Sequence, residues 1–168
     1  LFPLLIIRQL ILSIRDGNTG ASTYAYVCYG MLRSSMLGDT AGGREFGQLA
    51  LDLLQQLRAK EFQARTYFMY NVFIHHWKGA IAEPLQPLLD GYHAGLENGD
   101  LEFGSYCAAH YLTNAYYCGQ ALPALAERAR ELQAVVHSRH QEIAFHYASS
   151  CQQAILNLLG APGDPWML

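Results

Sequence analysis

A repeat of about forty residues constrains this chain more than any other feature of its sequence. Three glycines that would each end a helix recur at Gly38, Gly79 and Gly119, with spacings of 41 and 40 residues. A glutamate follows each glycine after 23 residues, and an apolar residue follows each glutamate. These glutamates are Glu61, Glu102 and Glu142. A fixed period of this length is typical of stacked helical hairpins, which usually bind or connect other molecules.

Apolar residues recur at helical spacing along the chain, and no sustained stretch alternates apolar and polar residues as a strand would. The pattern predicts eight helices, most of them ended by a glycine that takes the left-handed conformation. The predicted helices cover residues 4–15, 20–37, 40–58, 61–77, 81–97, 101–117, 121–137 and 139–159. Asp39 and Asp100 are placed to cap helix starts, and Pro84 and Pro123 fall in first turns.

The predicted helices are of two alternating kinds. The second, fourth, sixth and eighth hold most of the tyrosines and are named A helices, whereas the third, fifth and seventh are rich in leucine and alanine and are named B helices. The apolar stripes expected on B helices are Leu49, Leu53 and Leu57, and Leu88, Tyr92 and Leu96. Because an A/B hairpin cannot bury both faces alone, stacked hairpins share a continuous core. We expect an all-α, tetratricopeptide-like right-handed superhelix of antiparallel helix pairs over residues 1–160, with 161–168 as a linker or cut end.

The composition indicates one domain and argues against some partners. Of the 168 residues, 51% are hydrophobic and 15% charged, and the net charge of −3 lacks the basic excess that nucleic-acid binding needs. Residues 1–14 are very apolar, but they are too few to span a membrane and include Arg8. We interpret them as the last helix of a preceding unit in a longer protein. Their exposed apolar face is expected to promote homodimers. The four cysteines form no CxxC pair, so we expect buried free thiols and a cytoplasmic location. The cysteines are Cys28, Cys107, Cys118 and Cys151.

Three groups of side chains resemble metal or acid–base sites, and each has a simpler structural interpretation. Adjacent helical residues point about 100° apart, so His75 and His76 do not readily share a metal ion. Cys107 and His110 lie on one helical face, but further ligands are missing nearby. The densest group is His137, His140, Glu142 and His146. This group lacks the Pro-Cys-x-x-Cys segment of zinc-dependent deaminases. We therefore expect no metal and no cofactor.

The chain contains no nucleophile–base motif, phosphate-binding loop or kinase signature, so we do not expect an enzyme. Tyrosine and tryptophan dominate interface hot spots because they join a large apolar area to a polar tip. Ring side chains of the A helices are therefore the candidates for a binding groove. The candidates are Tyr67, Tyr70, Tyr106, Tyr111, His110 and Trp77. The competing interpretation places most of the tyrosines in the core.

Four segments carry a family resemblance, and they cover residues 46–54, 73–78, 89–102 and 153–160. They resemble the helical region in the middle of large bacterial signalling proteins, notably cyanobacterial ones. In those proteins a serine/threonine-kinase-like domain and an AAA-type ATPase module are joined to this helical region, and a GAF domain and often a histidine kinase follow. The resemblance extends over about 17–160. It implies a tetratricopeptide-like regulatory region and carries no catalytic residue onto this sequence.

The repeat and the resemblance together lead to one expected function. We expect a non-catalytic interaction domain that binds a peptide or a neighbouring domain and links an ATPase module to downstream signalling domains. The alternative is a sensor that takes a small molecule into the aromatic groove between helices, in a closed pocket with convergent polar groups. A metal-dependent enzyme is the third hypothesis.

Overall fold

Every regular element of residues 1–160, the part of the chain that the computed structural model describes, is a helix. The expectation of an all-α fold is therefore confirmed for these residues. The α-helices are α1 (Phe2–Asp16), α2 (Gly20–Met36), α3 (Thr40–Leu57), α4 (Gln63–Phe73), α5 (Leu85–Asn98), α6 (Leu101–Tyr117), α7 (Leu122–Ser138) and α8 (Glu142–Leu158). Two 3-10 helices, η1 (Lys60–Phe62) and η2 (His75–Trp77), flank α4. The predicted linker at 161–168 lies outside the described residues.

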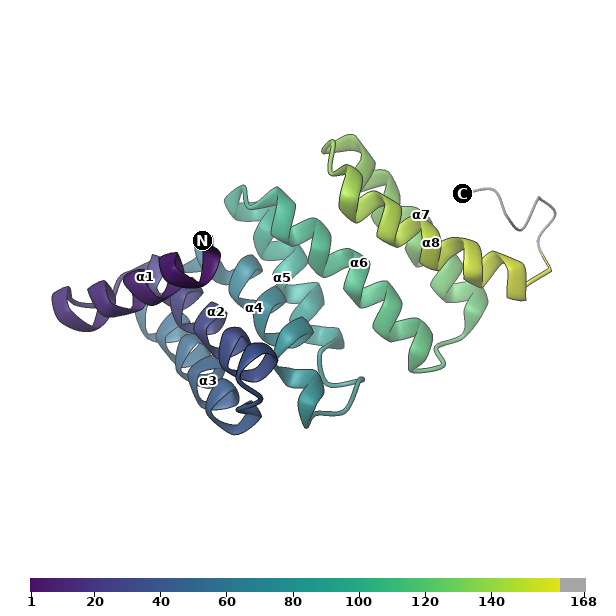
Figure 1. Cartoon of the computed structure of the whole chain (residues 1–168). Helices are drawn as coiled ribbons and strands as arrows, with labels where there is room; N and C mark the ends of the chain where they lie inside the picture. The colour runs from purple at the N-terminus through teal and green to yellow at the C-terminus, as the bar shows by residue number, and fades with distance from the viewer. Residues whose placement is uncertain (161–168) are drawn as a thin grey trace.

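The helices follow one another in sequence order from α1 at one end of the array to α8 at the other (Figure 1). The A helices α2, α4, α6 and α8 contact one another in succession. Each of the B helices α3, α5 and α7 packs against the A helix before it and the A helix after it. Side chains from four A helices therefore lie close enough to build one continuous surface.

Two of the three repeat glycines end helices as the sequence predicts. Gly38 after α2 and Gly119 after α6 have φ values of 69° and 73°, in the left-handed region that glycine adopts readily. Gly79 does not have a positive φ, so the prediction that it ends a helix in the same way is wrong. The turn between α7 and α8 has no glycine, and His140 takes the left-handed conformation there with a φ of 56°.

The largest departure from the predicted helices lies between α4 and α5. The predicted helix 61–77 is divided, because η1 and η2 occupy its two ends and leave only Gln63–Phe73 as α-helix. The next helix begins at Leu85 rather than at residue 81. Proline disfavours helical geometry in the residue before it, so Pro84 prevents an earlier start.

The side chain of one histidine bridges two parts of the intervening segment 74–84. The Nε2 atom of His75 lies 3.0 Å from Oε2 of Glu83 and 3.3 Å from the carbonyl oxygen of Ala80. A side chain at Gly79 would overlap the His75 ring, so this glycine makes room for the contact. The segment is thereby fixed as a wall beside α4.

Two helix pairs touch through glycine. A Cβ added to Gly30 of α2 would lie 2.6 Å from the carbonyl oxygen of Gly43 and 3.2 Å from the nitrogen of Gly47, both in α3. A Cβ added to Gly95 of α5 would lie 2.6 Å from Cα of Gly104 in α6. The α2–α3 and α5–α6 backbones therefore approach more closely than a side chain at either position would allow.

The buried stripe of the B helices agrees with the sequence on α5 and differs on α3. On α5, Leu88 and Tyr92 are buried as predicted, and Leu96, the third predicted position, is partly buried against the core. On α3, Leu49 and Leu57 are 46% and 39% exposed, so the predicted stripe is wrong for two of its three positions. The buried apolar side chains of α3 are Ala50, Leu53 and Leu54. Positions 43, 47, 50 and 54 share one helical face, so the glycine contact with α2 selects which face is buried.

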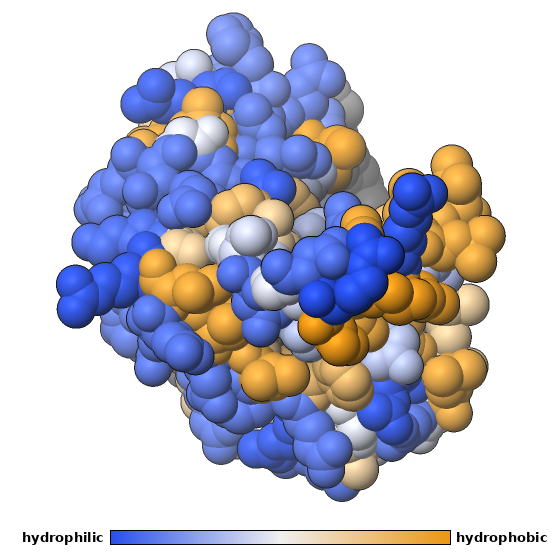
Figure 2. Space-filling model, turned by 90° about the vertical axis from the view of Figure 1, so that its left-hand side faces the viewer, coloured by the Kyte–Doolittle hydropathy of each residue, from blue (hydrophilic) through white to orange (hydrophobic). Residues whose placement is uncertain are grey.

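The first helix packs against α2 through Ile6 and Leu10 and leaves other apolar side chains exposed. Leu4 and Ile14, for example, are 70% and 67% exposed. Figure 2 looks onto the end of the molecule that carries α1, where apolar residues form patches between polar ones. The expected homodimer through this face stays a prediction. None of the helices found in residues 1–160 reaches the length and hydropathy of a membrane span.

Candidate binding site

A row of ring side chains crosses the A helices. The row, called the aromatic row below, consists of Tyr24 on α2, Phe68 on α4, Phe103, Tyr106 and His110 on α6, and Tyr147 on α8. The centroids of neighbouring rings lie between 5.3 and 6.1 Å apart, which is the range for favourable ring pairs. Phe68 is buried, Tyr147 is 59% exposed, and the other four side chains are partly exposed. The row therefore joins the core to an accessible aromatic surface.

Arg65 of α4 anchors one end of the aromatic row. Its guanidinium lies 5.2 Å from the ring centroid of Phe103 and 5.6 Å from that of Tyr24, close enough for cation–π attraction. Its Nε donates a hydrogen bond of 2.8 Å to Oδ2 of the buried Asp100. That bond raises the pKa of Arg65.

The prediction that Asp100 caps α6 with its side chain is wrong, because the carboxylate binds Arg65 instead. Asp39 does cap α3, because its Oδ1 atom accepts a hydrogen bond of 2.8 Å from the backbone N–H of Gly42.

A pocket of about 400 Å³ lies between α4, the segment 74–84 and α6, and it is called the α4–α6 pocket below. Its polar lining residues are Asn71, His75, His76, His110 and Asn114. Its other lining residues are Val72, Gly79, Ile81 and Pro84. The lining joins carboxamide and imidazole groups to apolar side chains, which is the usual make-up of a small-molecule site.

His110 belongs to both the aromatic row and the α4–α6 pocket. Its ring contacts Phe68 and Tyr147, with centroids 5.3 and 6.1 Å away. Burial lowers the pKa of His110, because a buried imidazolium is poorly solvated. At neutral pH the ring therefore acts as a neutral hydrogen-bonding group. The row and the pocket meet at this residue and form one continuous candidate site.

The structure does not bring the six predicted groove residues into one lining. Tyr106 and His110 share the aromatic row, whereas Tyr67 and Tyr70 line a second depression of about 160 Å³ with residues of α3 and α5. This second depression shares Asn71 with the α4–α6 pocket. Tyr111 is partly buried and packs against the core. Trp77 is 48% exposed, and its ring centroid lies 4.9 Å from that of His76.

Sequence reasoning missed two carboxamides that line the α4–α6 pocket, Asn71 and Asn114. They are 43 residues apart, and the same offset joins the Thr23–Thr66 hydroxyl contact of 3.2 Å between α2 and α4. An offset of 43 rather than the glycine spacing is therefore the signal that could have paired the two asparagines. Four members of the aromatic row were also missed: Tyr24, Phe68, Phe103 and Tyr147.

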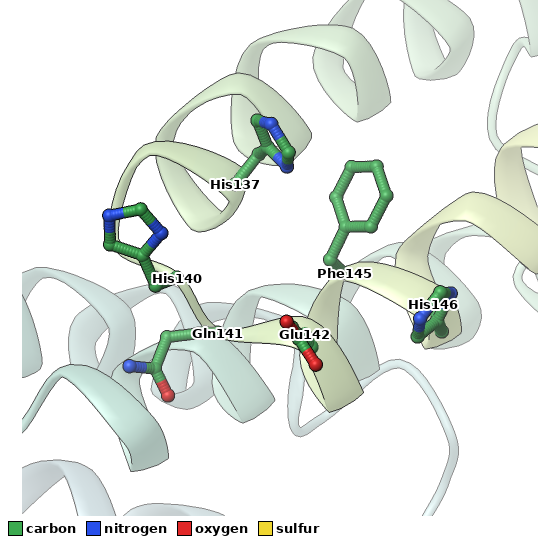
Figure 3. A pocket seen from close by; sticks show the side chains of 6 residues that line it. All are labelled: His137, His140, Gln141, Glu142, Phe145 and His146. Carbon is green, nitrogen blue, oxygen red and sulfur yellow. The ribbon is translucent and has the colours of Figure 1, made fainter.

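The histidines near the α7–α8 turn line a depression of about 240 Å³, called the α7–α8 depression below (Figure 3). The Phe145 ring lies beside His137, while His140 and His146 project from opposite ends of the group. Throughout residues 1–160, no three His, Cys, Asp or Glu side chains are grouped so that they could hold a metal ion. The arrangement in Figure 3 therefore favours the structural interpretation, in which these side chains lie near one turn without forming a joint metal site.

The four cysteines are free thiols. Cys28 and Cys107 are buried, and Cys118 and Cys151 are partly buried. Burial raises the pKa of Cys28 to about 12 and also raises that of Cys107. Thiolate is the nucleophilic form of cysteine, so these two buried thiols are held in the unreactive form.

Comparison with known protein families, with curated proteins and with solved structures gave no significant match to this chain.

Proposed function

We propose that this chain is a non-catalytic interaction domain that binds a peptide or a neighbouring domain along the aromatic row. The observation that carries the proposal is the continuity of the row over α2, α4, α6 and α8. Large ring surfaces contribute most of the binding energy at protein interfaces. A surface built by four helices also offers a length that suits an extended partner.

The proposed architecture is a tetratricopeptide-like right-handed superhelix. Its support is the alternation of helix contacts, in which A helices follow one another and B helices pack between them. Stacked hairpins of this kind rotate slightly from unit to unit and present an extended surface for binding. The A helices carry the aromatic row in this chain, so they are the proposed binding layer.

The proposed partners are the neighbouring domains of a longer cytoplasmic signalling protein. The support is the sequence resemblance over about 17–160, which places an ATPase module and a GAF domain beside such a helical region. In this role the domain catalyses no reaction itself and couples the conformational state of one neighbouring domain to that of the other.

The test is a binding titration of the chain against the adjoining ATPase and GAF domains, with single tyrosine variants. Tyr106→Ala removes a member of the aromatic row, and Tyr67→Ala is the matched control, because Tyr67 lies outside that row and lines the depression of about 160 Å³. Circular dichroism checks that both variants keep their helices. We expect Tyr106→Ala to weaken binding at least about tenfold and Tyr67→Ala to leave it within about twofold. Equal losses in the two variants, or no binding by the wild type, would reject the proposed surface.

A second candidate function is a small-molecule sensor, and the α4–α6 pocket favours it. The cavity of about 400 Å³ lies within the range of ligand sites, and five polar side chains converge on it. A ligand there would contact α4, α6 and the segment 74–84 at once. Binding would therefore change how two successive A helices and their connecting segment pack together.

A further inference from the structure

We infer that the α4–α6 pocket binds a small organic acid, in which one carboxylate is carried on an apolar body. This inference rests on the small-molecule function proposed for the same pocket and names its class of ligand. Three properties of the pocket support it: the absence of acidic side chains from its described lining, its free hydrogen-bond donors and its apolar wall.

Among the described residues, the pocket lining contains no acidic side chain. Its ionisable residues are His75, His76 and His110. The adjacent Lys78 is exposed, and within residues 1–160 it has no ion-pair partner. Glu83, in the segment beside the pocket, is paired with His75 at 3.0 Å. The described lining therefore holds no carboxylate that would repel an anion, as an Asp or Glu facing the pocket would.

The pocket offers donors that the fold leaves free. Asn71 donates one of its two Nδ2 hydrogens to the carbonyl oxygen of Tyr67 at 2.8 Å. Asn114 and His110 make no hydrogen bond with any described residue through their side chains, and each carries an N–H group. The exposed His76 supplies a third N–H group at the rim. A carboxylate accepts at both oxygens and can satisfy several of these donors together.

The remaining lining sets the size and charge of the ligand. Val72, Ile81 and Pro84 form an apolar wall that would cover the body of the acid. The lining contains no arginine and no lysine, so it lacks the bidentate or clustered cations that phosphate recognition usually employs. A singly charged carboxylate therefore fits the pocket better than a phosphate ester.

The test uses three probes of matched shape: phenylacetate, phenylacetamide and phenethylamine. Each is titrated into the ¹⁵N-labelled chain at pH 7, and the side-chain amide of Asn114 and nearby backbone amides are followed by NMR. Charge-assisted hydrogen bonds are about twice as strong as neutral ones, so we expect phenylacetate to bind about tenfold more tightly than phenylacetamide. Phenethylamine should bind most weakly of the three.

Two variants locate the effect. Asn114→Leu removes a donor and should abolish the preference for phenylacetate over phenylacetamide. His76→Ala removes the exposed donor and should reduce that preference, which keeps the inference testable if the first variant unfolds. His140→Ala, in the α7–α8 depression, is the matched histidine control and should bind the probes as the wild type does.

The outcomes separate the ligand class from the pocket function. If phenylacetamide or phenethylamine binds the pocket as tightly as phenylacetate, the carboxylate assignment is wrong and the pocket still takes small molecules. If none of the probes shifts the pocket resonances at millimolar concentration, both the inference and the sensor function fail. In either case the interaction surface on the aromatic row is left to its own test.

Discussion

Replacing Gly30 with alanine tests whether the glycine contact between α2 and α3 sets the packing of the array. The added Cβ would lie 2.6 Å from the carbonyl oxygen of Gly43 and 3.0 Å from Cδ1 of Ile74. Carbon and carbonyl oxygen normally approach to about 3.3 Å, so the two helices must separate by about 0.7 Å at this point. A backbone carbonyl cannot rotate away as a side chain could, so the strain spreads along both helices.

Two opposing terms decide the size of the effect. Overpacking of a tight contact costs about 1–3 kcal/mol, whereas alanine gains up to about 1 kcal/mol over glycine in a helix. We expect Gly30→Ala to lower the free energy of unfolding by about 1–2 kcal/mol. For a domain of this size that corresponds to a fall in Tm of about 2–8 °C.

The assay is urea denaturation followed by circular dichroism, supported by a thermal scan. Ser35→Ala is the control, because Ser35 lies on the exposed side of α2 and its replacement tests helix propensity alone. That variant should change stability by no more than about 0.5 kcal/mol. A Gly30→Ala variant as stable as the wild type would show that the α2–α3 contact yields without cost, and the packing argument would then be wrong.

Three further predictions follow from buried groups. Arg65→Met leaves the buried Asp100 carboxylate without its partner and should lower the free energy of unfolding by about 1–3 kcal/mol, with part of the loss recovered by adding Asp100→Leu. A double-mutant cycle in urea measures the coupling between the two residues, and a coupling energy near zero would show that the pair does not stabilise the fold. A thiol reagent should modify Cys118 in the folded protein well before Cys28, because burial raises the pKa of Cys28 to about 12; equal rates by mass spectrometry would contradict its burial. The pKa of His110 is lowered in the folded state, so the unfolded state binds more protons just below pH 6.5, and the free energy of unfolding should fall as the pH drops below that value. A His110→Gln variant should lose this pH dependence, and a pKa of about 6.5 or higher for His110, measured by NMR in the folded protein, would refute the prediction.

The sequence predicts the helices well where local chemistry decides them. Gly38 and Gly119 end their helices in the left-handed conformation, and Asp39 caps α3, because both effects depend only on nearby residues. The α4–α5 connection was predicted less well although its contacts are also local. His75 contacts Ala80 and Glu83 within the same segment, and no helical or strand periodicity signals such an irregular course.

Burial of the B-helix side chains was likewise predicted in one helix and missed in another. Leu88 and Tyr92 lie in a clear helical stripe and are buried as predicted. On α3 the glycines at 43 and 47 draw that face of the helix against α2, so Leu49 remains 46% exposed. A contact between two backbones thus overrides the leucine pattern, and a hydrophobic stripe alone cannot reveal it.

The candidate site was only partly predictable because the glycine period differs from the contact period. The repeat glycines are spaced 41 and 40 residues apart, but Thr23 contacts Thr66, and Cys107 contacts Ala64, each at an offset of 43. Residues aligned by the glycines are therefore two or three positions out of register with the residues that make these two contacts. At about 100° per residue, two or three positions carry a side chain to another face of its helix.

This difference in register explains why the predicted groove divides. Tyr67 and Tyr106 belong to successive A helices, yet the first faces α3 and α5 while the second joins the aromatic row. Asn71 and Asn114 keep the offset of 43 and do line the same pocket. The pairing of these two asparagines follows the offset at which Thr23 contacts Thr66, and the glycine spacing does not give it. Variants of Asn71 and Asn114 should therefore show coupled effects on the binding of a ligand in the α4–α6 pocket.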